Sequence, residues 1–352
     1  MDMESLAGAE FAPQTTYLNT ASSGLIPARS TAAMKAALDD AAVGVRYTDA
    51  AFEAVEETRA AYARLVGVPA RRVATGGSVV VYAGLIATSL PSGAEVLTAE
   101  GDFSSLVNPF AVRRDLKLRT VPLEELAEAV RPETALIAVS AVQSADGRIA
   151  DLDAIRDAAR AHGARTLVDL SQAVGWLPVS AGEDDFTVAV GYKWLLCPHG
   201  TAFLTVPEDL GGLTPVFAGW RSGEQPWDSC YGPVAEPARS ARRYDESPAL
   251  LAYVAARHSL ALLHELGTEA VRAHDRALAD RFRAGITGLG RSCVPAPGSV
   301  IVSVPGLGEA APRLAKADVQ VSARAGNLRA AFHLYNTPAD VDRLLEVLGD
   351  GA

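Results

Sequence analysis

The chain has 352 residues and a formal net charge of −10 at pH 7, and this length predicts about two domains with a large buried core. Its 49% hydrophobic and 21% charged residues are typical of a soluble globular protein and argue against a disordered chain. The acidic balance argues against a nucleic-acid-binding surface. We find no secretory signal pattern and no apolar run of ~20 residues, and therefore expect a cytoplasmic protein without a membrane partner. The three cysteines form no CxxC pair, so we expect neither a disulfide scaffold nor a metal site.

The first two thirds of the chain alternate short apolar runs with helical patterns. Helical periodicity begins after Pro27 and recurs over 49–66 and 151–163, where Asp151 suits the N-cap and Gly163 the stop position. Buried strands are predicted at residues 95–98, 118–121, 135–140, 166–169, 186–190 and 202–206. Strands that alternate with crossover helices predict an α/β fold with a mostly parallel, doubly wound sheet.

The periodicity fails over residues 211–247, a segment rich in Gly, Pro, Trp and Arg. Connectors of this length in compact domains are usually functional or disordered, and Trp220, Trp227 and Tyr231 argue against disorder. We expect the aromatic and arginine-rich part of the segment, residues 220–243, to decide which substrate is selected. Two long helices at 248–266 and 268–289, short strands at 299–304, 319–322 and 328–333, and a last helix with Thr337 as its N-cap follow. We predict a large domain over residues 15–250 and a small α+β domain over 251–352, with residues 1–14 packed near the small domain.

Two predicted strands are followed by charged residues at their carboxyl ends. Asp169 ends the strand at 166–169, and Lys193 follows the strand at 186–190. In open α/β sheets this edge is where ligands bind. A lysine among apolar neighbours is partly desolvated, which lowers its pKa and makes its amine a better nucleophile. From spacing alone, the alternative that both residues end their strands in water is equally good.

A glycine-rich turn supplies the third motif. Gly76, Gly77 and Ser78 precede an apolar helical run, and the free N–H groups at a helix N-terminus bind phosphate. Alone, such a turn is more often a simple N-cap. Together, an anion site, a carboxylate and a lysine predict pyridoxal phosphate, which needs a carboxylate at its ring nitrogen and a Schiff-base lysine.

On these motifs the chain resembles the class V aminotransferase family of fold type I, which includes cysteine desulfurases, kynureninases and isopenicillin-N epimerase-like proteins. The resemblance extends from Tyr17 to Leu348. It implies Asp169 on the pyridine nitrogen, Gln172 on the phenolic oxygen of the ring, and Lys193 as the Schiff-base lysine. The residues that it implies for cofactor binding are Gly77, Ser78, Phe103, Asp169, Gln172, Tyr192, Lys193 and Ser247. Among them, Phe103 stacks on the ring, and Tyr192 stands where many members have His.

The resemblance also implies a homodimer with a shared active site. The segment from Asp245 to Pro248 is similar to one that crosses the dimer interface to the partner's cofactor phosphate, with Ser247 in place of the usual Thr. Arg329 matches the arginine that holds the α-carboxylate of an amino-acid substrate, because a guanidinium pairs with a carboxylate bidentately. The residues implied for the substrate side are Asn19, Ser22, Ser144 and Arg329.

The reaction has several open alternatives. No cysteine lies over residues 318–334, which disfavours the enzyme persulfide of cysteine desulfurases. We expect action on an α-amino acid by transamination or β-elimination. An amino-acid epimerase, a kynureninase-like hydrolase and a non-catalytic scaffold with this fold stay open, although a scaffold needs neither Lys193 nor Arg329.

Overall fold

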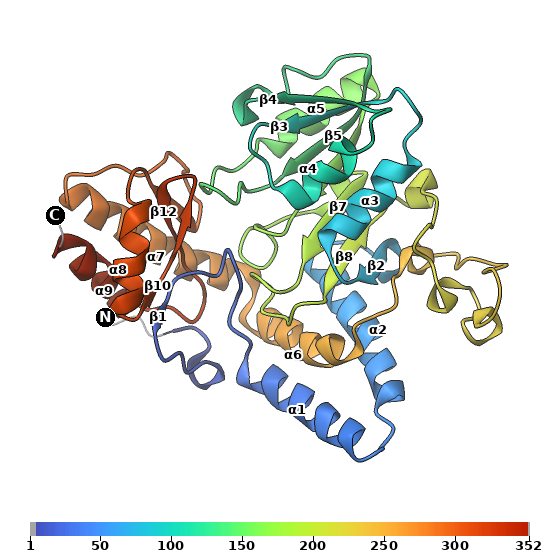
Figure 1. The fold of residues 1–352 in the computed structure, drawn as a ribbon, viewed down its shortest axis with the longest axis horizontal. Helices are drawn as coiled ribbons and strands as arrows, with labels where there is room; N and C mark the ends of the chain where they lie inside the picture. Colours follow the sequence, from blue (N-terminus) through green and yellow to red (C-terminus); the bar gives the residue numbers. More distant parts are fainter. Residues whose placement is uncertain (1–4, 351–352) are drawn as a thin grey trace.

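A seven-stranded sheet forms the centre of the computed structural model, which describes residues 5–350 (Figure 1). The strand order is β2-β8-β7-β6-β5-β3-β4; β8 runs antiparallel to both of its neighbours, and the other pairs are parallel. The strands are β2 (Val73–Gly76), β3 (Glu95–Ala99), β4 (Lys117–Val121), β5 (Thr134–Ser140), β6 (Arg165–Asp169), β7 (Phe186–Val190) and β8 (Ala202–Thr205). The predicted mostly parallel sheet is confirmed. The edge strand β2 was not predicted, because its four residues run directly into the glycine turn.

Helices cover both faces of this sheet, as the alternation of buried side chains along β5 requires. Ile137 and Val139 contribute to one hydrophobic core, whereas Leu136 and Ala138 contribute to the other. The first core is shared with α2 (Thr48–Leu65), α5 (Leu152–His162) and α6 (Leu250–Leu266), and the second with α3 (Val79–Ser89) and α4 (Ser104–Ala111). The large domain is therefore a three-layer α/β arrangement.

Local signals place the helix ends where the sequence predicts them. The side chain of Asp151 accepts a hydrogen bond from the N–H of Ala154, and Gly163 adopts the left-handed conformation with φ 72°. At the last helix, α9 (Pro338–Gly349), Thr337 and Asp340 form a reciprocal capping box. These ends are correct because each depends on residues only a few positions apart.

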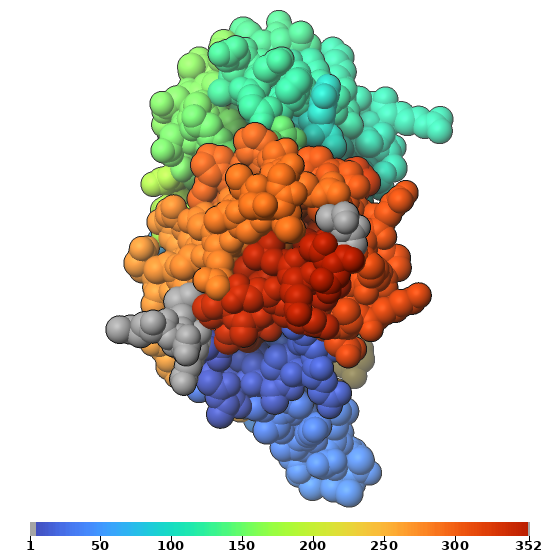
Figure 2. All heavy atoms as spheres, turned by 90° about the vertical axis from the view of Figure 1, so that its left-hand side faces the viewer, coloured from blue at the N-terminus to red at the C-terminus, as the bar shows by residue number. Residues whose placement is uncertain are grey.

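A smaller domain with its own core lies beside the sheet (Figures 1 and 2). It contains α7 (Thr268–Gly288), β9 (Ile301–Val304), α8 (Ala311–Lys316), β10 (Val319–Gln320), β11 (Ser322–Arg324), β12 (Asn327–Ala331) and α9. Strands β11, β12 and β9 form an antiparallel sheet, and the short β1 (Thr16–Tyr17) pairs with β10. Leu18 is buried in this core. The helix α6 packs in the core of the large domain, although the sequence analysis assigned residues from 251 onward to the small domain.

Two helices that precede the seven-stranded sheet in the sequence form a projection, which Figure 2 shows in blue below the small domain. They are α1 (Ala28–Ala42) and the first part of α2, and both helices pack against α6. Within the described residues, no helix has both the length and the apolar character needed to cross a membrane.

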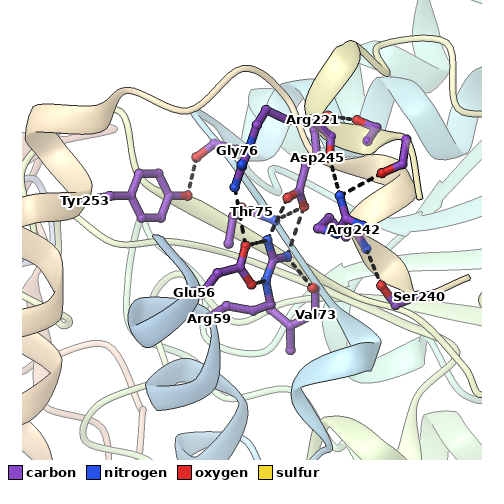
Figure 3. A network of polar contacts seen from close by, with 12 residues as sticks. Glu56, Arg59, Val73, Thr75, Gly76, Arg221, Ser240, Arg242, Asp245 and Tyr253 are labelled. Atoms are coloured by element: carbon purple, nitrogen blue, oxygen red, sulfur yellow. Dashed lines mark hydrogen bonds and ion pairs between the residues drawn. The ribbon is translucent and has the colours of Figure 1, made fainter. Parts of the chain in front are cut away.

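The irregular segment 211–247 is fixed by a buried charge network (Figure 3). Arg59 on α2 donates to both carboxylate oxygens of Asp245, at 2.6 and 3.0 Å, and to the carbonyl of Val73 at 2.7 Å. Asp245 also accepts the N–H of Thr75 at 2.8 Å. Arg242 donates to backbone carbonyls within the segment. The end of the segment is thus tied to β2, directly before the glycine turn.

Candidate active site

Several residues predicted to bind the cofactor lie at the carboxyl edge of the parallel strands. Phe103 follows β3, Asp169 ends β6 opposite Ser140 at the end of β5, and Lys193 follows β7. A pocket at this edge is lined by Ser78, Val79, Val80, Phe103, Ser105, Asp169, Ser171, Val190, Tyr192 and Lys193. Five of the residues predicted for the cofactor therefore share one pocket, whereas Gly77, Gln172 and Ser247 do not line it. Ligand binding at this edge agrees with the general rule for such sheets.

Asp169 is a buried acidic residue whose charged form a nearby cation would stabilise. Its side chain is 3% exposed, and Oδ1 accepts the N–H of Ser171 at 2.8 Å. Burial raises the pKa of Asp169, and the hydrogen bond from Ser171 and the charge of Lys193 oppose this rise. A protonated ring nitrogen would supply both a positive charge and a donor for this carboxylate.

Lys193 is the only buried lysine of the four in the sequence, and the other three, Lys35, Lys117 and Lys316, are exposed. Burial lowers the pKa of Lys193 to about 8; Asp169 opposes this shift, and the charges of Arg329 and Arg324 add to it. At pH 7 about a tenth of the amine is thus uncharged, far more than for a lysine of ordinary pKa, and this fraction can act as a nucleophile or a base.

Aromatic rings border the amine. The Nζ atom of Lys193 lies 5.1 Å from the ring centroid of Phe103 and 5.9 Å from that of Tyr192. The ring of Tyr192 stacks on His199, with centroids 3.7 Å apart. Phe103 keeps 41% of its surface exposed, so it is free to cover a flat ligand ring.

The N-terminal segment packs directly on the lysine loop. The N–H of Gly24 donates to the carbonyl of Tyr192 at 2.9 Å, and a Cβ atom at Gly24 would stand 2.1 Å from the carbonyl oxygen of Lys193. Leu196 on the same loop has φ 58°, a left-handed conformation that is strained for leucine. The sequence analysis missed both residues, because Gly24 lies in a polar turn with no local sign of a distant contact.

The glycine turn meets a carboxylate of the same chain. Ser78 is the N-cap residue of α3, but its side chain makes no capping hydrogen bond and lines the pocket. The N–H of Gly77 donates to the Oε2 atom of Glu246 at 2.7 Å. Glu246 was not predicted as a site residue. Ser247 is exposed, and its role toward a partner's phosphate stays a prediction.

A second cluster surrounds Arg329, whose side chain is almost fully buried. Its guanidinium donates to the Oγ atoms of Ser22 at 2.8 Å, Ser144 at 3.1 Å and Ser322 at 3.0 Å, and to the carbonyl of Ser144. The hydroxyl of Ser22 donates to Oδ1 of Asn19 at 2.8 Å. Over residues 5–350 no acidic side chain forms an ion pair with Arg329. All four residues predicted for the substrate side thus lie together around a guanidinium with a free charge.

Gln172 connects the cluster around Arg329 with the loop that carries Lys193. Its Nε2 atom donates to the carbonyl of Ala21 at 2.9 Å and to Oγ of Ser144 at 3.1 Å, and its Oε1 atom accepts the indole N–H of Trp194 at 2.8 Å. Both amide hydrogens are therefore engaged. A bond to the phenolic oxygen of the ring would have to take over one of them, and that role stays a prediction.

Asp102 is a further site residue that the sequence analysis missed. Its carboxylate accepts the N–H of Phe103 at 2.6 Å, the N–H and hydroxyl of Ser140 at 2.8 and 2.5 Å, and Nε2 of Gln143 at 3.2 Å. These bonds fix the start of α4 and hence the ring of Phe103. The Gly-Asp pair after a strand was the available signal, but its partners lie about 40 positions away.

The residues present fit pyridoxal phosphate. The pocket combines a helix N-terminus with a free hydroxyl, a buried carboxylate, a buried amine of lowered pKa and an aromatic face. When bound, this cofactor would be held at its ring nitrogen by Asp169 and covalently by Lys193. Its phosphate would be held by the α3 N-terminus at Ser78, and Glu246 would have to release the N–H of Gly77 before that group could also take part. Among the described residues, no group of three or more His, Cys, Asp or Glu side chains is suited to a metal ion.

Comparisons with known proteins identify the family of the chain. The model of the family "Aminotransferase class-V" matches residues 16–297. The chain is 29% identical over 315 residues to the uncharacterized aminotransferase YcbU of Bacillus subtilis, with 84% of each chain covered. It is 32% identical over 257 residues to isopenicillin N epimerase of Streptomyces clavuligerus, covering 64% of this chain and 63% of the relative.

The solved structures support the fold. The cystine C–S lyase C-DES, solved with its product cysteine persulfide, superposes with a TM-score of 0.85 at 23% identity, over 96% of this chain and 98% of that one. The predicted fold type I architecture, with its main sheet and smaller C-terminal sheet, is confirmed. The chain belongs to the class-V aminotransferase family of pyridoxal-phosphate-dependent enzymes.

Proposed function

We propose that this enzyme binds pyridoxal phosphate through Lys193 and acts on an α-amino acid by transamination or β-elimination. One observation carries the proposal: the only buried lysine of the chain shares a pocket with the buried Asp169 and lies close enough to Arg329 for that charge to lower its pKa. A scaffold that only binds a cofactor would need no guanidinium without an acidic partner in addition to this lysine.

Each of these residues has a distinct task. When bound, pyridoxal phosphate supplies an electron sink for the bond that breaks at the substrate's Cα atom. Asp169 holds the proton at the ring nitrogen. Arg329 binds the α-carboxylate in a fixed orientation, because its guanidinium is held by three serines. The amine of Lys193 accepts the proton from Cα, and its pKa of about 8 suits a base that works near neutral pH.

The placement of the cysteines supports a reaction without an enzyme persulfide. Cys197 is buried, and burial raises the pKa of its thiol far above the ordinary value. Cys293 packs against the core of the small domain, and Cys230 lies in the irregular segment. In the part of the chain that the structure describes, none of the three lines the pocket.

We also propose that the enzyme is a homodimer with a shared active site. Phe103 and Val80 line the pocket and are each 41% exposed, and exposed apolar side chains beside a pocket favour a covering partner. Ser247, exposed on the neighbouring segment, would reach the cofactor phosphate of the second copy. Light scattering on the purified protein tests this proposal: a dimer mass is expected, and a monomer that turns over amino acids contradicts it.

A panel of amino acids incubated with the purified, cofactor-loaded enzyme tests the reaction. Amine transfer to an oxo acid indicates transamination, and pyruvate released with ammonia or sulfide indicates β-elimination. Inversion at Cα or release of anthranilate from kynurenine would instead identify the epimerase or hydrolase alternative. The Lys193→Ala variant should lose all turnover, whereas the matched variant of an exposed lysine, Lys35→Ala, should keep it. No spectral change with any amino acid would contradict the proposal.

A further inference from the structure

A second arginine faces the same space as Arg329. In the hairpin of β11 and β12, Ser322 pairs with Arg329 and Arg324 pairs with Asn327. Ser322 and Arg324 lie two positions apart on β11 and so point to the same face of the hairpin. Both arginines therefore extend from one face, toward the N-terminal segment.

The two guanidiniums meet at one hydroxyl. Ser22 Oγ accepts a hydrogen bond from Arg329 at 2.8 Å and another from Arg324 at 3.2 Å. The same hydroxyl donates its hydrogen to Asn19. The serine thus uses its full hydrogen-bonding capacity, but a neutral hydroxyl cancels none of the charge of the two cations.

The positive charge of this cluster has no counterpart in the described part of the chain. Neither arginine forms an ion pair there, whereas many other arginines pair with carboxylates, as Arg59 does with Asp245. Burial lowers the pKa of Arg329 to about 10, and the charge of Arg324 adds to this shift. One α-carboxylate would balance only one of the two guanidiniums.

We propose that the substrate is an α-amino acid with a second carboxylate on its side chain, which Arg324 binds while Arg329 holds the α-carboxylate. The inference rests on the proposed function of the site. The division of tasks follows from burial: Arg329 is buried and is linked through Ser144 and Gln172 to the lysine loop, whereas Arg324 is exposed at the end of β11. Arg324 is therefore the guanidinium that meets the outer end of a bound substrate, and it sets specificity.

Binding of simple acids tests the proposal without any cofactor chemistry. Succinate and glutarate are compared by titration calorimetry with their half-amides, which have the same shape and one carboxylate fewer. The protein is used both loaded with and stripped of pyridoxal phosphate. We expect each dicarboxylate to bind about tenfold more tightly than its half-amide, the effect of one charge-assisted hydrogen-bonded pair.

Variants assign this preference to Arg324. In Arg324→Gln the preference for the dicarboxylate should disappear while the half-amide binds as before, and Arg324→Lys should keep part of it. Arg291→Gln, the same change at an exposed arginine of the small domain, should leave it unchanged. Equal binding of acid and half-amide, no binding of either dicarboxylate, or an equal loss of both ligands in Arg324→Gln would overturn the proposal.

The two proposals fail separately. None of these ligands carries an amine, so a protein that never links the cofactor to Lys193 still reports on Arg324. Conversely, turnover of neutral amino acids only, with equal binding of acids and half-amides, would refute the dicarboxylate substrate and leave the proposed function standing.

Discussion

Replacing Lys193 by methionine removes a charge from the pocket and keeps most of the side-chain volume. Lys193 is 5% exposed, and burial lowers its pKa from 10.5 to about 8. Below pH 8 both the folded and the unfolded chain carry the ammonium, and the folded state bears the full penalty of burying it. Between pH 8 and 10.5 only the unfolded chain keeps the proton, so the penalty falls as pH rises. The pKa difference between the unfolded and the folded chain corresponds to a destabilisation of the folded state by about 3 kcal/mol when the lysine is charged.

Urea unfolding of the cofactor-free proteins at pH 7 and pH 10 measures this penalty. The free energy of unfolding of Lys193→Met minus that of the parent should be about 2–3 kcal/mol larger at pH 7 than at pH 10, because the variant lacks the buried ammonium. Lys35→Met, at an exposed site on α1, should show no such difference. A Lys193→Met effect that is the same at both pH values would refute the reasoning, because the amine would then be ionised alike in both states.

Three further substitutions test other contacts. Arg329→Gln should weaken carboxylate binding about 10- to 100-fold in a ligand titration, by loss of a charged hydrogen bond; unchanged affinity would contradict the assignment. Asp245→Asn leaves the buried Arg59 without its main partner and should lower the free energy of unfolding by about 3–5 kcal/mol; a loss below ~1 kcal/mol would show that the pair behaves as a surface contact. Gly24→Ala should lower stability by about 1–3 kcal/mol through its clash with the lysine loop. Gly219→Ala, where the added Cβ meets open space, is its control, and equal melting temperatures of the two variants would contradict the clash.

The parts of the fold that follow from short-range patterns could be predicted from the sequence. The helix ends at Asp151 and Gly163 depend on neighbouring residues, and both are confirmed. The meeting of Asp169 and Lys193 at one edge was predictable as well, because parallel strands place their carboxyl ends together. The edge strand β2 was not predicted, because four residues before a turn are too few to show the alternation typical of a strand.

Contacts between segments that lie far apart in the chain could not be predicted from the sequence. Glu246 meets the glycine turn across 169 positions, and Ser22 meets Arg329 across 307. Nothing local distinguishes Arg324 from any other exposed arginine. Only the folded hairpin and the N-terminal segment together reveal that two guanidiniums share one hydroxyl.

Reduction of the cofactor-loaded enzyme with borohydride, followed by peptide mapping, tests the covalent role of Lys193 most directly. With four lysines in the sequence, the outcome is unambiguous. A single pyridoxyl group on the peptide that contains Lys193 is the predicted result. An unmodified Lys193, or a label at one of the three exposed lysines instead, would contradict the account.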